Sequence, residues 1–265
     1  MSGRFAQMGR ALMEGLELDR APVQISYLPS APTGIPRHPG GAPSVCTFFA
    51  EGTERSFYAD LAAHEACEVG AFVLGIPPEG ELGDRLRGTL GQMGSREYLS
   101  PAEVARVPHN AKPPRFVAYG PLGTLPVPPT TVLALARPRG AMLAAETTGY
   151  SAPLLGRPMC SIVPTLVAGT QVAISAGCIG SRIYAGLGDD VVIVGLRGDH
   201  LPLFLQRLKR VRAANDWLAG EVRSRKDASS APTPRRAPRG TRLAPRRPGS
   251  SARPGARPRR AGRSR

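Results

Sequence analysis

Four cysteines are the residues of this chain with the clearest capacity for chemistry. They are Cys46, Cys67, Cys160 and Cys178. As thiolates, such residues bind soft metal ions, hold iron–sulfur clusters or act as nucleophiles and redox groups. None of them belongs to a Cys-x-x-Cys pair, the tight knuckle from which structural zinc sites usually take two ligands. We therefore expect any metal site to form only where the fold brings separate segments together.

Two segments of the chain share one order of residues around these cysteines. Each has a cysteine, a Gly-Thr pair, a short β-rich run, a second cysteine and a glycine eight residues after it. The first segment runs from Cys46 to Gly75 and the second from Cys160 to Gly186. This order predicts an internal duplication with possible half-repeats at about 20–95 and 115–198. A chance match is the alternative, because Gly and Thr are common and the intervening spacings differ.

An internal duplication would explain how cysteines from separate segments come close together in the fold. Two copies related by an approximate two-fold axis would bring Cys46 and Cys67 opposite Cys160 and Cys178. We therefore interpret the chain as a metal-binding or iron–sulfur redox protein, with His64 as an alternative ligand close to Cys67. Redox or nucleophilic thiols are a second interpretation. Buried thiols that act as small apolar side chains are a third.

The surroundings of Cys178 also suit a different ligand. A helix is expected to start at this cysteine, and helix starts attract anions through unpaired N–H groups and the helix dipole. Arg182 would supply the countercharge. This alternative describes an enzyme or binding module for a small anion, and a non-catalytic interaction protein is a further alternative, so enzymatic activity is uncertain. The residues expected to bind the ligand are Gly177, Gly180, Ser181, Arg182, Tyr184 and His64.

The elements that must position these residues indicate an α+β fold. Apolar, β-rich runs predict strands, whereas the amphipathic spacing of residues 200–223 predicts a C-terminal helix. The order of helices and strands lacks the regular alternation of a doubly wound sheet. The expected strands are 22–28, 115–120, 130–136 and 191–196.

Charge separates a domain at 1–227 from a tail at 228–265. The net charge is +15, and the tail holds twelve Arg without Lys, Asp or Glu, so residues 1–227 carry 15 − 12 = +3. With a single large apolar residue, Leu243, the tail is predicted to be disordered. Its arginines would bind nucleic acid weakly and without sequence specificity. Drift in a GC-rich genome explains the same composition, and we favour that explanation.

The location is predicted to be cytoplasmic. The first twenty residues carry six charges and lack the apolar run of a secretory signal. The uncharged stretch 158–181 contains Pro164, Gly169 and Gly177, so a membrane span is not expected there. Without export the thiols would stay reduced.

Several segments resemble the family called domain of unknown function 169. The resemblance covers about residues 20–205, in consistent order, and its last two segments are the most specific. It implies a bacterial or archaeal cytoplasmic protein in which all four cysteines belong to family motifs, and it supplies no reaction. The matching segments are FYADLAAHEACEVGAFVLG (57–75), YLSPAEVARVP (98–108), FVAYGPL (116–122), RPRGAM (137–142), GRPMCSIVP (156–164) and SAGCIGSRIYAGLGDD (175–190).

Overall fold

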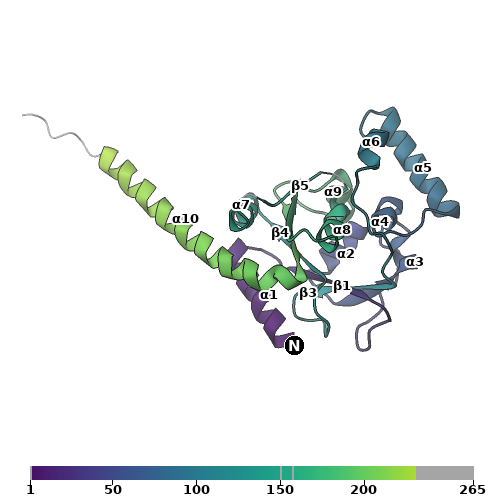
Figure 1. Ribbon diagram of the computed structural model, residues 1–265, viewed down its shortest axis with the longest axis horizontal. Helices are drawn as coiled ribbons and strands as arrows, with labels where there is room; N and C mark the ends of the chain where they lie inside the picture. The colour runs from purple at the N-terminus through teal and green to yellow at the C-terminus, as the bar shows by residue number, and fades with distance from the viewer. Residues whose placement is uncertain (1, 150, 157, 231–265) are drawn as a thin grey trace, which may run out of the picture. The chain divides into compact units, whose positions relative to one another are not determined.

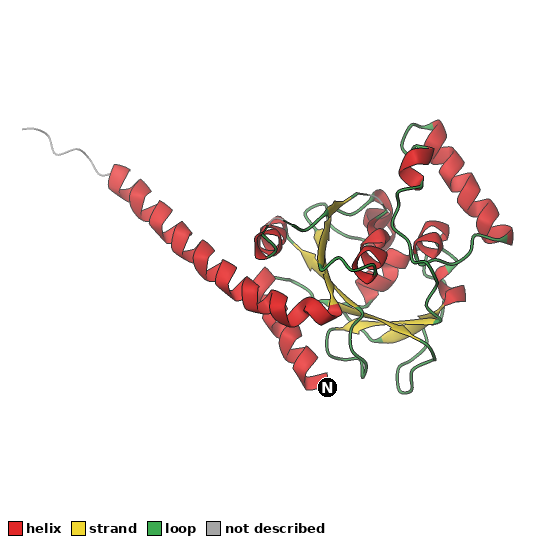
Figure 2. Cartoon of the chain, in the orientation of Figure 1, coloured by secondary structure: helices red, strands yellow, loops and turns green. Residues whose placement is uncertain are grey.

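The computed structural model describes residues 2–149, 151–156 and 158–230 (Figure 1). The chain divides into two units, residues 1–221 and 222–265, and the strands of the described residues all lie in the first. Its helices accompany one seven-stranded sheet, which confirms the α+β class. Figure 2 shows helices on both sides of that sheet.

The elements have the following bounds. The α-helices are α1 (Ser2–Leu16), α2 (Val45–Glu51), α3 (Leu61–His64), α4 (Glu68–Val73), α5 (Gly80–Ser95), α6 (Pro101–Val104), α7 (Pro138–Thr147), α8 (Ile162–Val167), α9 (Ile179–Ala185) and α10 (Leu201–Ser230). Two 3₁₀ turns are η1 (Met159–Ser161) and η2 (Gly198–His200). The strands are β1 (Val23–Leu28), β2 (Phe57–Asp60), β3 (Phe116–Pro121), β4 (Thr131–Ala136), β5 (Leu154–Leu155), β6 (Val172–Ser175) and β7 (Val192–Arg197).

The sheet consists of two halves with the same strand arrangement. Its order is β2-β3-β1-β4-β7-β6-β5, and every pair is antiparallel except β5 with β6. At the centre β1 pairs with β4, so that Val23 lies opposite Leu133 and Ile25 opposite Thr131. Outward from that pair, β1-β3-β2 on one side mirrors β4-β7-β6 on the other. Strand β3 therefore lies in the first half, whereas the spacing of the sequence had placed residues 115–120 in the second.

Helices occupy matching places in the two halves. In each half a helical turn with a cysteine comes after the central strand, Cys46 in α2 directly after β1 and Cys160 in η1 after β4, α7 and β5. An outer strand follows, and then a helix whose N-cap is a cysteine, Cys67 before α4 or Cys178 before α9. The halves differ in their insertions. The first has α3 before α4 and the segment 74–115, with α5 and α6, between α4 and β3, whereas the second has α7 and β5 between β4 and η1.

The central strands of the sheet are buried on both faces, and most of their side chains are apolar. On β4, Leu133 belongs to the core under α2 and α8, whereas Val132 belongs to the core under α1, α7 and α10. Full burial of one such side chain stabilises a fold by about 1.5–3 kcal/mol. The first core also contains the cysteines Cys46 and Cys160, so the candidate site and the hydrophobic core share one layer.

Two boundaries differ from the sequence-based expectation. Helix α10 starts at Leu201 and continues to Ser230, so residues 228–230, expected in the tail, are helical. Residues 231–265, and with them most of the predicted disordered tail, lie outside the described residues. The uncharged stretch 158–181 is divided among η1, α8, β6 and the start of α9. Among the described residues, no helix combines the length and apolar character that crossing a membrane requires.

Candidate functional site: a cavity lined by four cysteines

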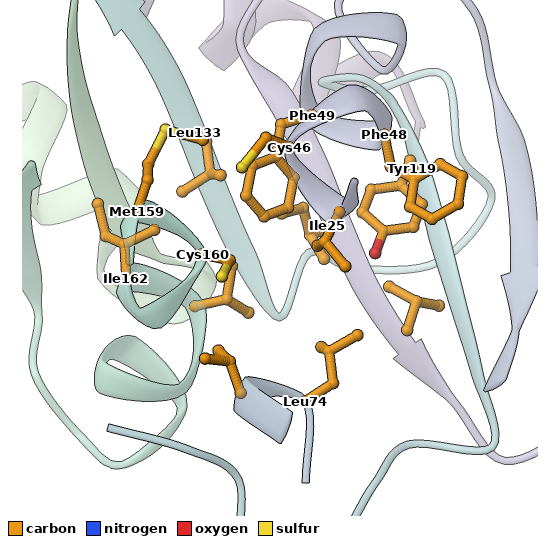
Figure 3. Packing of buried hydrophobic residues seen from close by; sticks show 14 of the residues in the cluster. Ile25, Cys46, Phe48, Phe49, Leu74, Tyr119, Leu133, Met159, Cys160 and Ile162 are labelled. Atoms are coloured by element: carbon orange, nitrogen blue, oxygen red, sulfur yellow. The ribbon is translucent and has the colours of Figure 1, made fainter. Parts of the chain in front are cut away.

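All four cysteines line one cavity of about 360 Å³. They reach it from four separate places, the first turn of α2, the N-cap of α4, the turn η1 and the N-cap of α9. Cys46 and Cys160 are buried, Cys67 and Cys178 are partly exposed, and each is a free thiol. Figure 3 shows Cys46 and Cys160 among the side chains of the first core, with Leu133 and Met159 beside them.

Local capping interactions hold the first pair of cysteines. Ser44 caps α2 by accepting the N–H of Thr47, which fixes the turn that carries Cys46. The Cys67 sulfur accepts the N–H of Gly70 at 3.3 Å, and thus caps α4 in the manner of a serine. Gly70 is required here, because a Cβ atom at this position would lie 2.4 Å from Val45 Cγ2.

Similar interactions hold Cys178. The Ser181 hydroxyl donates to the carbonyl of Cys178 at 2.6 Å and accepts its N–H at 3.0 Å, which closes a capping box at the start of α9. Gly177 precedes it with φ of +85°, in the left-handed region that favours glycine. The guanidinium of Arg182 donates to the carbonyls of Ala176, Gly188 and Val191. These bonds tie the start of α9 to the loop that leads into β7.

The thiols differ in their proton affinities. The pKa of Cys178 is lowered to about 5, chiefly because the thiol of Cys46 donates a hydrogen bond to it, with help from the N–H groups of Met159 and Ser181. The same bond is the main reason why the pKa of Cys46 is raised well above its ordinary value. Burial is the main cause of the raised pKa of Cys67 and of Cys160. Cys178 is therefore the thiolate of the group at neutral pH.

The cavity can bind a thiophilic group, but the sulfurs do not form a site for a single ion. Within the described part of the chain, no group of three or more His, Cys, Asp or Glu side chains is arranged to hold a metal ion. The expected four-ligand site for one metal ion is therefore not found there. The physical reason is that each sulfur is held by its own turn or cap, and these turns belong to four different segments.

The family now follows from the comparison with known proteins. A family model, DUF169, described as uncharacterised ArCR, matches residues 11–207. The chain belongs to this family. The DUF169 match covers both halves of the sheet and all four cysteines, and it ends within α10. No curated protein and no solved structure matches the chain.

The structure of this DUF169 protein brings some of the other predicted residues to the cavity. Gly180 and Tyr184 line it, and Gly177 and Arg182 line an adjoining recess. The Ser181 side chain is buried in the cap of α9. Because Arg182 already donates to three backbone carbonyls, its contacts favour a role in fixing the loop.

His64 lies apart from the cysteines. Its Nδ1 lies 2.6 Å from the carbonyl oxygen of Asp60, its Nε2 lies 2.9 Å from the Tyr119 hydroxyl, and its ring packs edge-on against Phe48. Burial lowers its pKa to about 4. Both ring nitrogens have partners within the aromatic core, and His64 is not among the residues that line the cavity. The structure therefore gives it no place as a ligand of the same site.

The sequence did not reveal the apolar wall of the cavity. The apolar residues of the segment 81–93 repeat every three to four positions, which is the spacing of a helix. That spacing shows that α5 has an apolar face, but it does not show what the face covers. The residues of this wall are Phe72, Leu86, Leu90, Met93, Leu99, Val104 and Val107, and Ile179 and Ile183 of α9 complete it.

Proposed function

We propose that the protein binds an iron–sulfur cluster through Cys46, Cys67, Cys160 and Cys178 and acts as a redox protein. The observation that carries this proposal is that every cysteine of the chain lines the same cavity. Packing of a hydrophobic core does not require that cysteines from four separate segments line the same cavity. Ligands of one cluster must converge, because the cluster is built from thiolate-bound iron.

The symmetry of the sheet supports the same proposal. Each half supplies one cysteine from a buried turn and one from a helix N-cap, so each half contributes an equivalent pair to the cavity. The arrangement also provides N–H groups for the sulfurs. Gly70 donates to Cys67, and Met159 and Ser181 donate to Cys178. Hydrogen bonds of this kind stabilise the charge of a thiolate-ligated cluster and set its potential.

A cluster accounts for the spacing better than a single ion. Four sulfurs on one ion would have to lie within roughly 4 Å of one another, because each metal–sulfur bond is about 2.3 Å long. The described residues do not provide that arrangement. In a [4Fe–4S] cluster each cysteine binds its own iron atom, so the cage of sulfurs is wider. A cytoplasmic location, which is part of the proposal, would keep the thiols reduced.

A dithiol redox pair is the second candidate, and one contact favours it. The thiol of Cys46 donates a hydrogen bond to the thiolate of Cys178, so the two sulfurs are neighbours. Oxidation would join them in a disulfide and pass two electrons to the disulfide of an exchange partner, whose two thiols would take up the one proton of Cys46 and a second proton from solvent. Cys67 and Cys160 would then take no part in the reaction.

Metal analysis and an absorption spectrum after anaerobic purification test the proposal. We expect iron and acid-labile sulfide in similar amounts and a broad visible absorption that dithionite bleaches. Each of the four Cys→Ser variants should lose iron and colour. Ala59→Ser is the matched control, because it places a hydroxyl in the same core without removing a sulfur. Iron-free, colourless protein after anaerobic reconstitution would contradict the cluster.

The same variants separate the two candidates. If the dithiol pair is the functional group, only Cys46→Ser and Cys178→Ser should abolish a disulfide that forms on mild oxidation. Cys67→Ser and Cys160→Ser should then behave as the parent protein does. A requirement for all four cysteines supports the cluster, and a requirement for two supports the pair.

A further inference from the structure

The cavity has two sides of different origin. The four sulfurs come from elements that both halves of the sheet possess. The opposite wall comes largely from the insertion 74–115, which contains α5 and α6. In the second half the corresponding connection, from α9 to β7, is the short segment 186–191. One half has therefore acquired a structure that covers the sulfurs, and the other has not.

The insertion directs apolar side chains into the cavity. Leu86, Leu90 and Met93 lie on one face of α5 and line it, and Val104 and Val107 follow from α6 and the turn after it. Polar contacts attach α5 to the body at its side. Arg85 donates to the carbonyl of Glu65 at 2.7 Å, and Thr89 donates to the carboxylate of Glu68 at 2.6 Å. The apolar face of α5 is therefore held over the cavity.

Helix α9 supplies apolar side chains that the protein itself does not cover. Ile179 is 60% exposed and Ile183 is 68% exposed, and both line the cavity. Large apolar side chains that remain accessible around a concave site are typical of places where a small molecule binds. The volume of about 360 Å³ lies within the usual range of such sites, roughly 300–1,000 Å³.

A charged recess adjoins the cavity. It has a volume of about 690 Å³ and shares Tyr98, Leu99, Cys178 and Ile179 with the cavity, so the two are continuous there. Among the residues that the structure describes, Arg106 and Arg182 line the recess together with one acid, Glu103. The carboxylate of Glu103 is held in the capping box of α6 by the N–H and hydroxyl of Ser100, both at 2.8 Å.

Arg106 is the cation of this recess that is best placed to bind a ligand. Its Nε donates to the carbonyl of Ala102 at 3.0 Å, and its two Nη groups have no partner among the residues that the structure describes. Arg182, by contrast, uses its N–H groups on backbone carbonyls and adds only its positive charge. The guanidinium of Arg106 is exposed and has a geometry that matches a carboxylate.

We propose that the cavity and the recess together bind a small organic anion. Its apolar body would lie between α5, α6 and α9, and its carboxylate would bind Arg106 in the recess. Three of the four sulfurs line the cavity and not the recess, whereas Arg106 and Arg182 line the recess and not the cavity, so the charged end would point toward the recess. The inference deepens the proposed function and rests on it for one point, that the bound molecule lies beside a cluster.

Titration calorimetry on the full-length protein tests the inference with octanoate and 1-octanol as probes. Octanoate should bind at one site per chain, and 1-octanol should bind at least about tenfold more weakly, because a charge-assisted hydrogen bond contributes about 1.5–3 kcal/mol. Arg106→Gln should weaken octanoate binding by about tenfold and leave the binding of 1-octanol unchanged. Leu90→Gln should weaken the binding of both probes.

Arg87→Gln is the matched control, because Arg87 lies on the exposed side of α5 and pairs only with Asp84 among the described residues. It should bind both probes as the parent protein does. The inference is overturned if octanoate does not bind, if both probes bind equally well, or if Arg106→Gln binds octanoate normally. Iron measured on the same samples keeps the two proposals apart. Protein without iron that binds octanoate through Arg106 would refute the cluster and leave this inference standing. Protein with iron that does not bind octanoate would refute this inference and leave the cluster standing.

Discussion

The thiol of Cys46 donates a hydrogen bond to the sulfur of Cys178, and this contact joins the two halves of the sheet at the candidate site. Cys46 belongs to α2 of the first half, and Cys178 caps α9 of the second. Helices α2 and α9 also touch where Thr47 donates to the carbonyl of Tyr184 at 3.4 Å. The contact explains why two similar cysteines have opposite pKa shifts.

The reactivity of Cys178 should depend on Cys46. In protein freed of metal with a chelator, the Cys178 pKa of about 5 means that the thiolate predominates at pH 7. Cys46→Ala removes the main cause of that low pKa, so the thiolate fraction and the alkylation rate at pH 7 should fall. Iodoacetamide labelling followed by peptide mass spectrometry measures the rate at Cys178. An unchanged rate would mean that the backbone N–H groups alone keep Cys178 ionised.

Stability should fall in acid because of His64. Its folded-state pKa of about 4 lies below the ordinary value of 6.5, so the unfolded state binds the proton more tightly. The stabilisation is complete above pH 6.5 and is lost progressively as the pH falls toward 4. Thermal unfolding at several pH values should show a steeper loss for the parent protein than for His64→Gln.

A matched control for this prediction is His109→Gln, because His109 is exposed. That variant should lose stability with pH as steeply as the parent protein does. Equal slopes for the parent protein and His64→Gln would contradict the assignment of this acid sensitivity to the buried ring.

Gly70→Ala should disturb both the packing and the cysteine site. The new methyl group would meet Val45 Cγ2 at 2.4 Å and the Cys67 sulfur at 2.9 Å. Overpacking of this kind costs about 1–3 kcal/mol, which urea unfolding can measure. If the cluster proposal is correct, the variant should also contain less iron, because the sulfur is displaced.

Gly91→Ala is the control for that substitution. Nothing lies within 4 Å of a Cβ atom at this position of α5, so no contact is strained. Because alanine favours a helix over glycine by about 1 kcal/mol, the variant should be as stable as the parent protein or slightly more stable. A loss of stability in this control would show that substitutions of helical glycines are harmful here for another reason.

Ser181→Ala should loosen the start of α9. The variant loses the two hydrogen bonds of the Ser181 hydroxyl with the backbone of Cys178, and losses of capping contacts cost about 0.5–2 kcal/mol. Urea unfolding should show this decrease. Ser95→Ala is the comparison, because that hydroxyl is exposed and bonds only to the carbonyl of Gln92 in the described part of the chain. Similar stabilities for the two variants would contradict a capping role for Ser181.

The sequence by itself determined the local elements and the order of the cysteines. β-rich runs identified β1, β3, β4 and β7 nearly to the residue, because strand formation follows the local pattern of apolar and branched side chains. The spacing of Ser100 and Glu103 in the sequence Ser-Pro-Ala-Glu is that of a capping box, and both of its hydrogen bonds are present. Family membership was also readable, since its motifs are contiguous stretches of sequence.

The tertiary structure alone decided which of these elements meet. The pairing of β1 with β4 joins segments far apart in the chain, and no local pattern specifies a strand's partner. That pairing brings the cysteines to one cavity, and the same folding carries His64 away into the aromatic core. The roles of Arg182 and α5 could not be predicted from the sequence. The sequence shows that Arg182 is charged and that α5 has an apolar face. Only the fold shows that Arg182 donates to backbone carbonyls and that α5 lines the cavity.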